Sequence, residues 1–338
     1  MKLQTSFHRP FFLKRDNLKY FAMGIAALLI LLLTTFYLSF KYLKPASNQT
    51  PAVLIQKDTL PPIVPISDTI CTFVVPHDVK MKHYFTFIDS LRRVFDTLLP
   101  YKLTEYILVR SNSFIIDSLE NTDYYRMKMR DSFVYDQKKL VILRKGDTLK
   151  IPTLEKVDTL KSKMARTSLD INIPEFKLRI IEGNDTIYTF PVRVGQNRTR
   201  YLEEVGREVD LRTLKGTGTI AFVYKKDFFI DPVEGKKFTS TKRDDGNRTL
   251  MPLQPWLEPK INGQLRGQLI HPTTNPSSLY KAYSNGCIGT READIWRIYY
   301  YAPVGTKVRI RYDLKVRNEN GDTIQLKHIY NPKNMLYL

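Results

Sequence analysis

The longest apolar stretch of the chain covers residues 20–40, "YFAMGIAALLILLLTTFYLSF", and contains no charged side chain. At about 1.5 Å of rise per residue, a helix of this length crosses a hydrocarbon core of roughly 30 Å. We therefore expect a single transmembrane helix. A cleaved signal peptide is the alternative, although this run is longer than the usual apolar region of such peptides and no small-residue cleavage site closely follows it.

Charge on the amino-terminal side of this stretch predicts its orientation. Residues 1–19 carry an excess of basic side chains, which favours a cytoplasmic amino terminus: Lys2, Arg9, Lys14, Arg15 and Lys19 oppose Asp16 alone. We expect residues 1–19 to be a cytoplasmic basic tail, the span to lie in the inner (cytoplasmic) membrane, and everything beyond it to be exported to the periplasm.

Residues 41–76 have the composition of a linker, because six prolines are interspersed with Ser, Thr, Asn and Gln. Residues 77–165 then predict a small α+β domain. Apolar residues at three- and four-residue spacings between Asp78 and Leu99 indicate an amphipathic helix that ends before Pro100. "YILVR" at 106–110 is strand-like, and "LVILRKGDTLKIP" at 140–152 places a polar turn between two apolar runs. That ending resembles the last strand of LysM glycan-binding modules, but a generic β-turn explains it equally well.

Residues 166–338 change to alternating, β-rich patterns. A hairpin is predicted where "FKLRIIEG" and "DTIYTFPVRVG" flank Gly183 and Asn184. Further strands are expected in "GTGTIAFVY", "LRGQLIHP" and "TKVRIRYDLKV", and "VRNENGDTIQLKHIY" reads as an additional carboxyl-terminal hairpin. One helix is expected to start near Thr290, with Ile295, Ile298 and Tyr299 on its apolar stripe.

The formal net charge of +19 normally suggests nucleic acid as a partner. An exported domain rarely meets nucleic acid, so we expect no nucleic-acid partner. A basic surface outside the membrane favours an anionic envelope polymer or the membrane surface instead.

Cysteine and histidine are scarce, which narrows the candidate chemistry. The chain has two cysteines and five histidines; Cys287 lies in the β-rich region, and because His328 sits in its tail, His271 is the candidate base within it. A thiol and an imidazole are the nucleophile and base that acyl transfer requires. Cys287 is also expected about three residues before a helix, whose amino terminus lowers a thiol pKa. The alternatives are a buried structural cysteine or a disulfide with Cys71.

The region around these residues resembles the catalytic domain of bacterial L,D-transpeptidases, the YkuD family. The likeness covers roughly residues 170–312 and includes a strand ending in His271, a loop, "SNGCI" at 284–288, a helix, and the strand "GTKVRI". It implies a mainly β fold with few helices: an L,D-transpeptidase-like β-sandwich catalytic domain at 166–338, preceded by the transmembrane helix and the small α+β domain.

The resemblance also implies roles for particular residues. Cys287 is the expected nucleophile, His271 the base and then acid, and Ser284 the serine of the family motif. Backbone N–H groups around Gly286 and Cys287 are expected to hold the oxyanion. Tyr280, Tyr283, Asn285 and Arg291 are weaker candidates for substrate binding. No metal or organic cofactor is implied, and the expected partners are peptidoglycan stem peptides.

Two departures from the family pattern leave alternatives open. Asn285 stands where a second histidine is common, and Gly289 stands where an arginine commonly follows Cys-Ile. Arg291, two positions later, is a candidate for the missing guanidinium. The candidate functions are therefore an L,D-transpeptidase that forms cross-links or attaches an amine acceptor, an L,D-carboxypeptidase, or an inactive peptidoglycan-binding protein. The sequence does not identify the acyl acceptor.

Overall fold

The computed structural model describes residues 71–318 and 320–331. The predicted basic tail, the predicted span at 20–40 and most of the predicted linker lie outside this range. Within the described ranges, no helix is both long and apolar enough to cross a bilayer. The end of the predicted linker is wrong, because Cys71–Val74 form strand β1, which pairs antiparallel with β4 (Thr148–Ile151).

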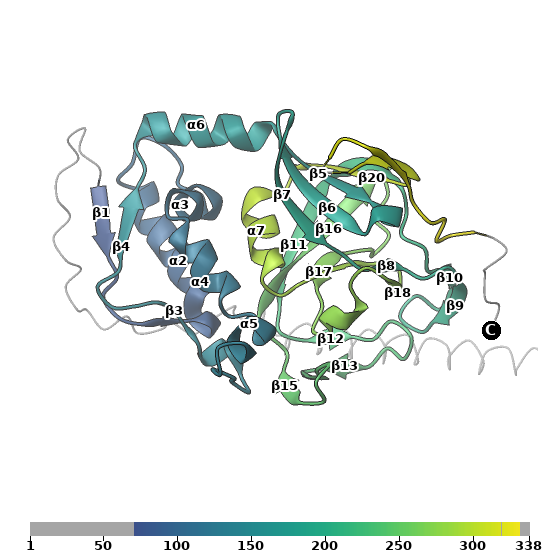
Figure 1. Cartoon of the computed structure of the whole chain (residues 1–338). Helices are drawn as coiled ribbons and strands as arrows, with labels where there is room; N and C mark the ends of the chain where they lie inside the picture. Colours follow the sequence, from purple (N-terminus) through teal and green to yellow (C-terminus); the bar gives the residue numbers. More distant parts are fainter. Residues whose placement is uncertain (1–70, 319, 332–338) are drawn as a thin grey trace, which may run out of the picture. The chain divides into compact units, whose positions relative to one another are not determined.

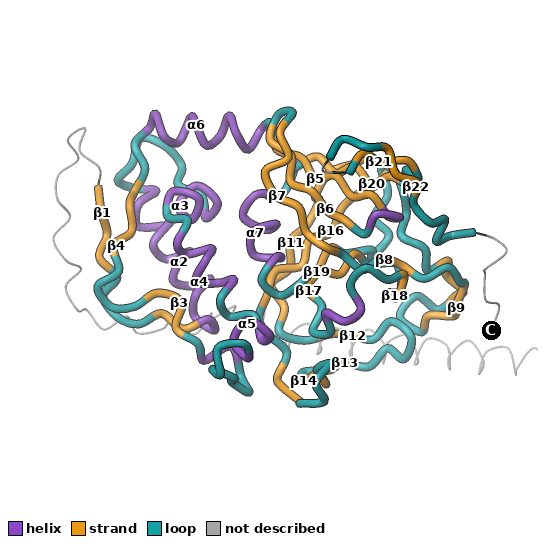
Figure 2. The backbone as a smooth tube through the Cα atoms, in the orientation of Figure 1, coloured by secondary structure: helices purple, strands orange, loops and turns teal. Residues whose placement is uncertain are grey.

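Residues 71–165 form a helical segment held by short strands (Figures 1 and 2). A second antiparallel pair joins β2 (Val79–Lys80) to β3 (Val141–Leu143). The helices are α2 (Met81–Asp96), α3 (Glu105–Ser111), α4 (Phe114–Glu120), α5 (Tyr124–Lys128) and α6 (Leu154–Ala165).

The amphipathic helix predicted between Asp78 and Leu99 is confirmed as α2, which buries Ile88, Leu91 and Phe95. The strand-like interpretation of "YILVR" is wrong, because these residues lie in α3. Thr104 caps this helix: its side chain accepts a hydrogen bond from the backbone N–H of Ile107 at 3.2 Å. An N-cap and tertiary packing here override the β propensity of Tyr, Ile and Val.

Residues 166–331 are mainly β, as predicted, and are built around one eight-stranded mixed sheet. Its strand order is β19-β17-β16-β11-β20-β5-β6-β7. The bounds are β5 (Thr167–Asn172), β6 (Lys177–Glu182), β7 (Asp185–Pro191), β11 (Gly216–Lys226), β16 (Gln254–Ile261), β17 (Ile270–Pro272), β19 (Ile288–Thr290) and β20 (Lys307–Arg311). Most neighbours are antiparallel, but β19 runs parallel to β17 and β20 runs parallel to β5.

Smaller strand pairs surround this sheet. β8 (Val194–Gly195) pairs in parallel with β18 (Ala282–Ser284). The antiparallel pairs are β9 (Thr199–Leu202) with β10 (Arg207–Asp210), β12 (Phe229–Ile230) with β13 (Lys237–Phe238), β14 (Ser240–Lys242) with β15 (Arg248–Leu250), and β21 (Lys315–Arg317) with β22 (Thr323–Gln325). The predicted hairpins at 177–191 and at the carboxyl terminus are thereby confirmed. Of "LRGQLIHP", only Ile270–Pro272 form a strand.

The late helix is α7 (Asp294–Tyr301), which begins four residues after the predicted start. Thr290 is not its N-cap, because it ends strand β19. The backbone N–H of Ala293 instead donates to Asp123 Oδ2 at 3.0 Å, so the helical segment supplies the hydrogen bond at the start of α7. Helix α7 lies between that segment and the sheet, where it contacts α3, α4, β16 and β17 (Figure 1). One continuous apolar core therefore joins residues 71–165 to the sheet.

Candidate active site

Cys287 precedes the edge strand β19, which runs parallel to β17. The backbone N–H of Ile288 donates to the carbonyl of Leu269 at 2.8 Å and ties the two segments together. The thiol is half-buried. It accepts a hydrogen bond from the backbone N–H of Leu269 at 3.3 Å and donates a longer one to the carbonyl of Gly267 at 3.7 Å. Backbone groups therefore fix the sulfur.

His271 is buried in the middle of β17. Its ring stacks on the indole of Trp256, with 4.4 Å between ring centroids and 14° between planes. Nδ1 lies 2.8 Å from the carbonyl oxygen of Pro272. A carbonyl oxygen only accepts, so Nδ1 carries the proton and Nε2 is left as the acceptor. This is the tautomer that a general base needs.

The thiol and the imidazole come from neighbouring strand segments. His271 pairs with Gly289, two residues after Cys287. Cys287 and His271 both line one groove of about 960 Å³, which we call the Cys287 groove. Its charged lining residues are Glu204, Arg207, Asp210, Arg212, Lys226, Glu258 and Arg266.

The surroundings favour the neutral form of both groups. Burial, followed by the positive charge of Arg193, lowers the pKa of His271 to about 3. Burial also raises the pKa of Cys287, which the Leu269 N–H and the charge of Arg193 partly counteract. The expected helix-dipole effect on this thiol is wrong, because a strand follows Cys287 and α7 starts only at Asp294. The resting site is therefore a thiol beside a neutral imidazole.

The turn before Cys287 is held by several hydrogen bonds. Ser284 is buried, and its hydroxyl donates to the carbonyl of Cys287 at 2.5 Å. Gly286 has a φ of +106°, which glycine adopts without strain, and its carbonyl accepts from Thr213 Oγ1 at 2.9 Å. A Cβ at position 286 would lie 2.7 Å from Gln268 Nε2. Asn285 lines the Cys287 groove.

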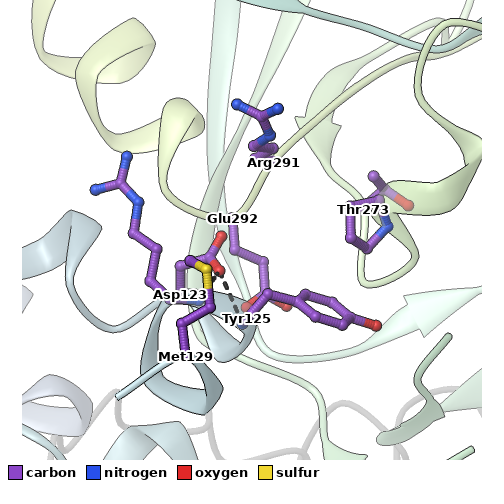
Figure 3. A pocket seen from close by; sticks show the side chains of 8 residues that line it. Asp123, Tyr125, Met129, Thr273, Arg291 and Glu292 are labelled. Atoms are coloured by element: carbon purple, nitrogen blue, oxygen red, sulfur yellow. Dashed lines mark hydrogen bonds between the residues drawn. The ribbon is translucent and has the colours of Figure 1, made fainter. Parts of the chain in front are cut away.

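Three of the weaker candidates lie elsewhere. Tyr280 and Tyr283 are 56% and 63% exposed and do not line the Cys287 groove. Arg291 lines a separate cavity of about 340 Å³ together with Asp123, Tyr125, Met129, Thr273 and Glu292, among others (Figure 3). Arg291 therefore does not supply a guanidinium beside Cys287, because it follows strand β19 and lines a different cavity.

The two cysteines are both free thiols, so the disulfide alternative is wrong as well.

Some residues of the site escaped the sequence analysis. Trp256 and Glu258 alternate along β16 and both line the groove, where Tyr224 donates to Glu258 Oε2 at 2.6 Å. The run "QPWLEP" does not alternate and contains two prolines, so no local pattern identifies this strand. Arg193 packs against Gly289 through a contact that no local pattern encodes.

Glu292 takes part in a buried network rather than in the first turn of a helix. It forms an ion pair with Arg243, and the two side chains are 2% and 0% exposed. Glu292 also accepts from Gln137 Nε2 at 2.8 Å and from the backbone N–H of Tyr124 at 3.1 Å. Arg243 donates to Gln137 Oε1 at 2.9 Å and to Thr249 Oγ1 at 2.8 Å. This network joins the helical segment to the chain five residues after the thiol.

Comparison with known proteins gives a family for part of the chain. Residues 166–310 match the family model YkuD, described as the L,D-transpeptidase catalytic domain. A Bacillus subtilis protein named "Putative L,D-transpeptidase YciB" is 27% identical over 155 residues, which are 44% of this chain and 67% of that protein.

Solved structures similar to this chain include three described as L,D-transpeptidases. The one from Xylanimonas cellulosilytica has a TM-score of 0.32 and 11% identity, and the match covers 74% of this chain and 100% of the other. Those from Mycobacterium tuberculosis and Mycobacterium smegmatis have TM-scores of 0.27 and 0.29 and identities of 14% and 17%; each match covers 43% of this chain. The chain spans 57% and 58% of those two mycobacterial chains, less than two thirds of each.

Proposed function

We propose that the YkuD-family domain at residues 166–310 is an L,D-transpeptidase that acts on peptidoglycan stem peptides through an acyl-enzyme on Cys287. The observation that carries this proposal is that Cys287 and His271 line the same groove. The family match supports the substrate class. The geometry of the groove alone does not identify a substrate.

In the first half of the reaction, His271 Nε2 takes the proton of the Cys287 thiol as the sulfur attacks the carbonyl carbon of an L,D peptide bond. The bond lies between the third and fourth residues of the stem. The carbonyl oxygen becomes an oxyanion, for which the backbone N–H groups around Gly286 and Cys287 are the proposed donors. When the C–N bond breaks, the imidazolium gives its proton to the departing amine, leaving a thioester on Cys287 and a free D-amino acid.

In the second half, an acceptor amine attacks the thioester carbon, and His271 removes a proton from that amine. The C–S bond breaks, and the proton returns from the imidazolium to the thiolate. An amine on a neighbouring stem gives a cross-link, an amine on a protein gives an attachment, and water gives L,D-carboxypeptidase activity. The same two residues serve all three outcomes, so the acceptor decides the product.

The neutral resting pair fits this sequence of proton transfers. Because burial disfavours both the thiolate and the imidazolium, the proton moves only when a carbonyl carbon is in place to accept the sulfur lone pair. Premature oxidation or alkylation of the sulfur, which requires the thiolate, is thereby slowed. Orientation of Nδ1 toward Pro272 keeps Nε2 ready throughout the cycle.

Acylation by a carbapenem tests the proposal, because the strained lactam carbonyl of a carbapenem reacts with a nucleophilic thiol to form a stable covalent adduct. The full chain, incubated with a carbapenem and analysed by intact mass, is expected to gain one adduct that is absent from Cys287→Ala. His271→Gln is expected to slow the adduct by about 100-fold or more, in line with the usual contribution of a general base. A chain that binds isolated peptidoglycan but forms neither adduct nor new muropeptide would instead be the inactive wall-binding protein.

A further inference from the structure

We propose that Arg193 is a positioning residue of this site: its half-buried side chain fills the place that a side chain at position 289 would occupy, and supplies a fixed positive charge beside Cys287 and His271. This inference rests on the proposed function for its catalytic meaning. Its geometry stands independently of that function.

Arg193 is fixed to the strand that follows the nucleophile. It lies between β7 and β8, and its backbone forms an isolated antiparallel bridge with Gly289. The N–H of Arg193 donates to the carbonyl of Gly289 at 2.9 Å, and the N–H of Gly289 donates to the carbonyl of Arg193 at 3.0 Å. The bridge holds the start of the arginine side chain against β19.

Position 289 has no room for a side chain while Arg193 is in place. A Cβ built on Gly289 would lie 2.5 Å from Arg193 Nε, 2.6 Å from its Cγ and 2.9 Å from its Cδ. Contacts this short do not occur between real side chains, so an alanine at 289 requires Arg193 to move. Gly289, which departs from the family pattern, is thus explained by a neighbouring side chain and is not evidence of lost activity.

The strand register shows which face Arg193 occupies. Gly289 pairs with His271 in a parallel register, so their Cβ positions project to the same side of the sheet. The space that Arg193 fills above Gly289 is therefore next to the imidazole, and Gly289 lies two residues after Cys287. Trp256 stacks on His271. The imidazole consequently has an indole on one side and a guanidinium on the β19 side.

The guanidinium is only partly satisfied by its neighbours. Nη1 donates to Ser278 Oγ at 3.3 Å, which ties Arg193 to the loop between His271 and Cys287. Nε is buried and has no hydrogen-bond partner in the described part of the chain. A cation that gives up a hydrogen bond on burial costs stability, so a purely structural role would favour an apolar side chain here. The retained charge points to a role in the electrostatics of the site.

The charges around the pair agree with that role. The positive charge of Arg193 acts to lower the pKa values of both Cys287 and His271. The other groups that act on the thiol are Glu204 and Glu258, which oppose Arg193, and Lys226 acts on the imidazole in the same direction as Arg193. The remaining titratable or charged residues of the groove are Arg207, Asp210, Arg212, Tyr224 and Arg266. Arg193 thus stabilises the thiolate, and by opposing the imidazolium it makes His271 a weaker base but a stronger acid toward the departing amine.

The test measures the thiol directly and needs no peptidoglycan. In a Cys71→Ser background Cys287 is the sole cysteine, so the pH dependence of its alkylation by iodoacetamide reports its thiolate. Arg193→Met keeps the length of the side chain and removes the charge. We expect it to shift the alkylation midpoint upward by about one pH unit, which slows alkylation about tenfold at pH values below the midpoint. Arg193→Lys is expected to shift it less.

Gly289→Ala is a second way to remove the Arg193 side chain from its place above β19, because the added Cβ displaces it. It is expected to shift the midpoint in the same direction as Arg193→Met, and the double variant is expected to show no additional shift, because both changes remove the same charge from the same place. Thermal unfolding of each variant shows whether it is folded. A wild-type midpoint in a folded Arg193→Met variant would overturn the proposal and leave Arg193 as a packing residue.

Failure of the proposed function gives a different result. If the unmodified chain forms no carbapenem adduct while the alkylation midpoint still depends on Arg193, the electrostatic role stands and the transpeptidase assignment falls. If adducts form at equal rates in the unmodified chain and in Arg193→Met, and the midpoint does not move, only the inference about Arg193 falls.

Discussion

At the scale of single residues, the surroundings of His271 suit the role of base that we propose for it. Stacking on Trp256 fixes the plane of the ring, and the Pro272 carbonyl fixes the proton on Nδ1. Burial keeps the ring neutral at any pH near 7, since its pKa is about 3. These three constraints leave Nε2 as an unprotonated acceptor without the need for a carboxylate partner.

The burial of neutral His271 makes a prediction about stability and pH. Its folded pKa, about 3, lies below the ordinary value of about 6.5 that it has when unfolded. Between these values the unfolded chain binds a proton that the folded chain excludes, so this residue's contribution to stability is present above about pH 6.5 and is lost as the pH falls toward 3. The slope is at most about 1.4 kcal/mol per pH unit.

Urea denaturation of the unmodified chain and of His271→Gln between pH 4 and pH 7.5 measures this effect. Glutamine does not titrate, so the difference in free energy of unfolding between the two proteins is expected to shrink steadily as the pH falls below 6.5. A difference that stays constant over this range would mean that the pKa of His271 is the same in the folded and unfolded chains, which contradicts the view that burial lowers it.

The sequence identified Cys287 and His271 because the chain has few residues of either type and because the motif around Cys287 is specific. Arg193 could not be identified in the same way. Its relation to the site depends on a backbone bridge to Gly289, nearly a hundred residues later, and on the absence of a Cβ there. Long-range contacts of this kind leave no local periodicity in the sequence.

At the scale of elements, the segment after Cys287 shows how tertiary context changes a local prediction. Thr290, Glu292 and Asp294 have the composition of a helix start, yet Ile288–Thr290 pair with β17 and become a strand. The helix then begins at Asp294, where Asp123 of the helical segment accepts the N–H of Ala293. The amphipathic α2 and the hairpin of β6 and β7 were predictable because their patterns are local and complete.

The buried pair of Arg243 and Glu292 makes a prediction at this scale. Removal of one partner leaves the other charge buried and unpaired, so Arg243→Met or Glu292→Leu is expected to cost about 3–5 kcal/mol of unfolding free energy. The double variant is expected to lose much less than the sum of the two, because no isolated charge remains. Urea denaturation of the three variants measures the coupling.

The exposed pair of Lys236 and Glu234 is the matched control, because its side chains are 69% and 52% exposed. Lys236→Met is expected to leave the urea midpoint unchanged, since solvent screens such pairs. Additive losses from Arg243→Met and Glu292→Leu would contradict the view that the two charges depend on each other. Carbapenem acylation of the folded double variant would then show whether the network also positions the Cys287 segment.

At the scale of the whole molecule, the helical segment is joined to the sheet by more than a linker. Tyr84 and Tyr300 exchange a buried hydrogen bond of 2.6 Å between their hydroxyls, and Phe85 packs on Trp296. Arg297 pairs with Glu120 and Asp117. Contacts from residues 71–165 thus meet α7 along its length, and α7 in turn packs against β16 and β17, the strands that carry Trp256 and His271. The helical segment thus packs, through α7, against the strands that carry the candidate site.

Anchoring at residues 20–40 remains a proposal, and it is consistent with a substrate found outside the cytoplasmic membrane. Deletion of residues 1–40 is expected to move the protein from the membrane pellet to the soluble fraction after cell lysis, because the proposed anchor supplies the long apolar stretch of the chain. Deletion of residues 45–65 is the control and is expected to leave it in the pellet, since it shortens only the proline-rich spacer. Both deletions spare residues 71–331, so carbapenem acylation of Cys287 is expected in each. Intact-mass analysis of the unmodified protein decides between anchor and signal peptide: a full-length mass supports the anchor, whereas a mass that lacks the apolar stretch shows that the segment is removed and that the domain is released.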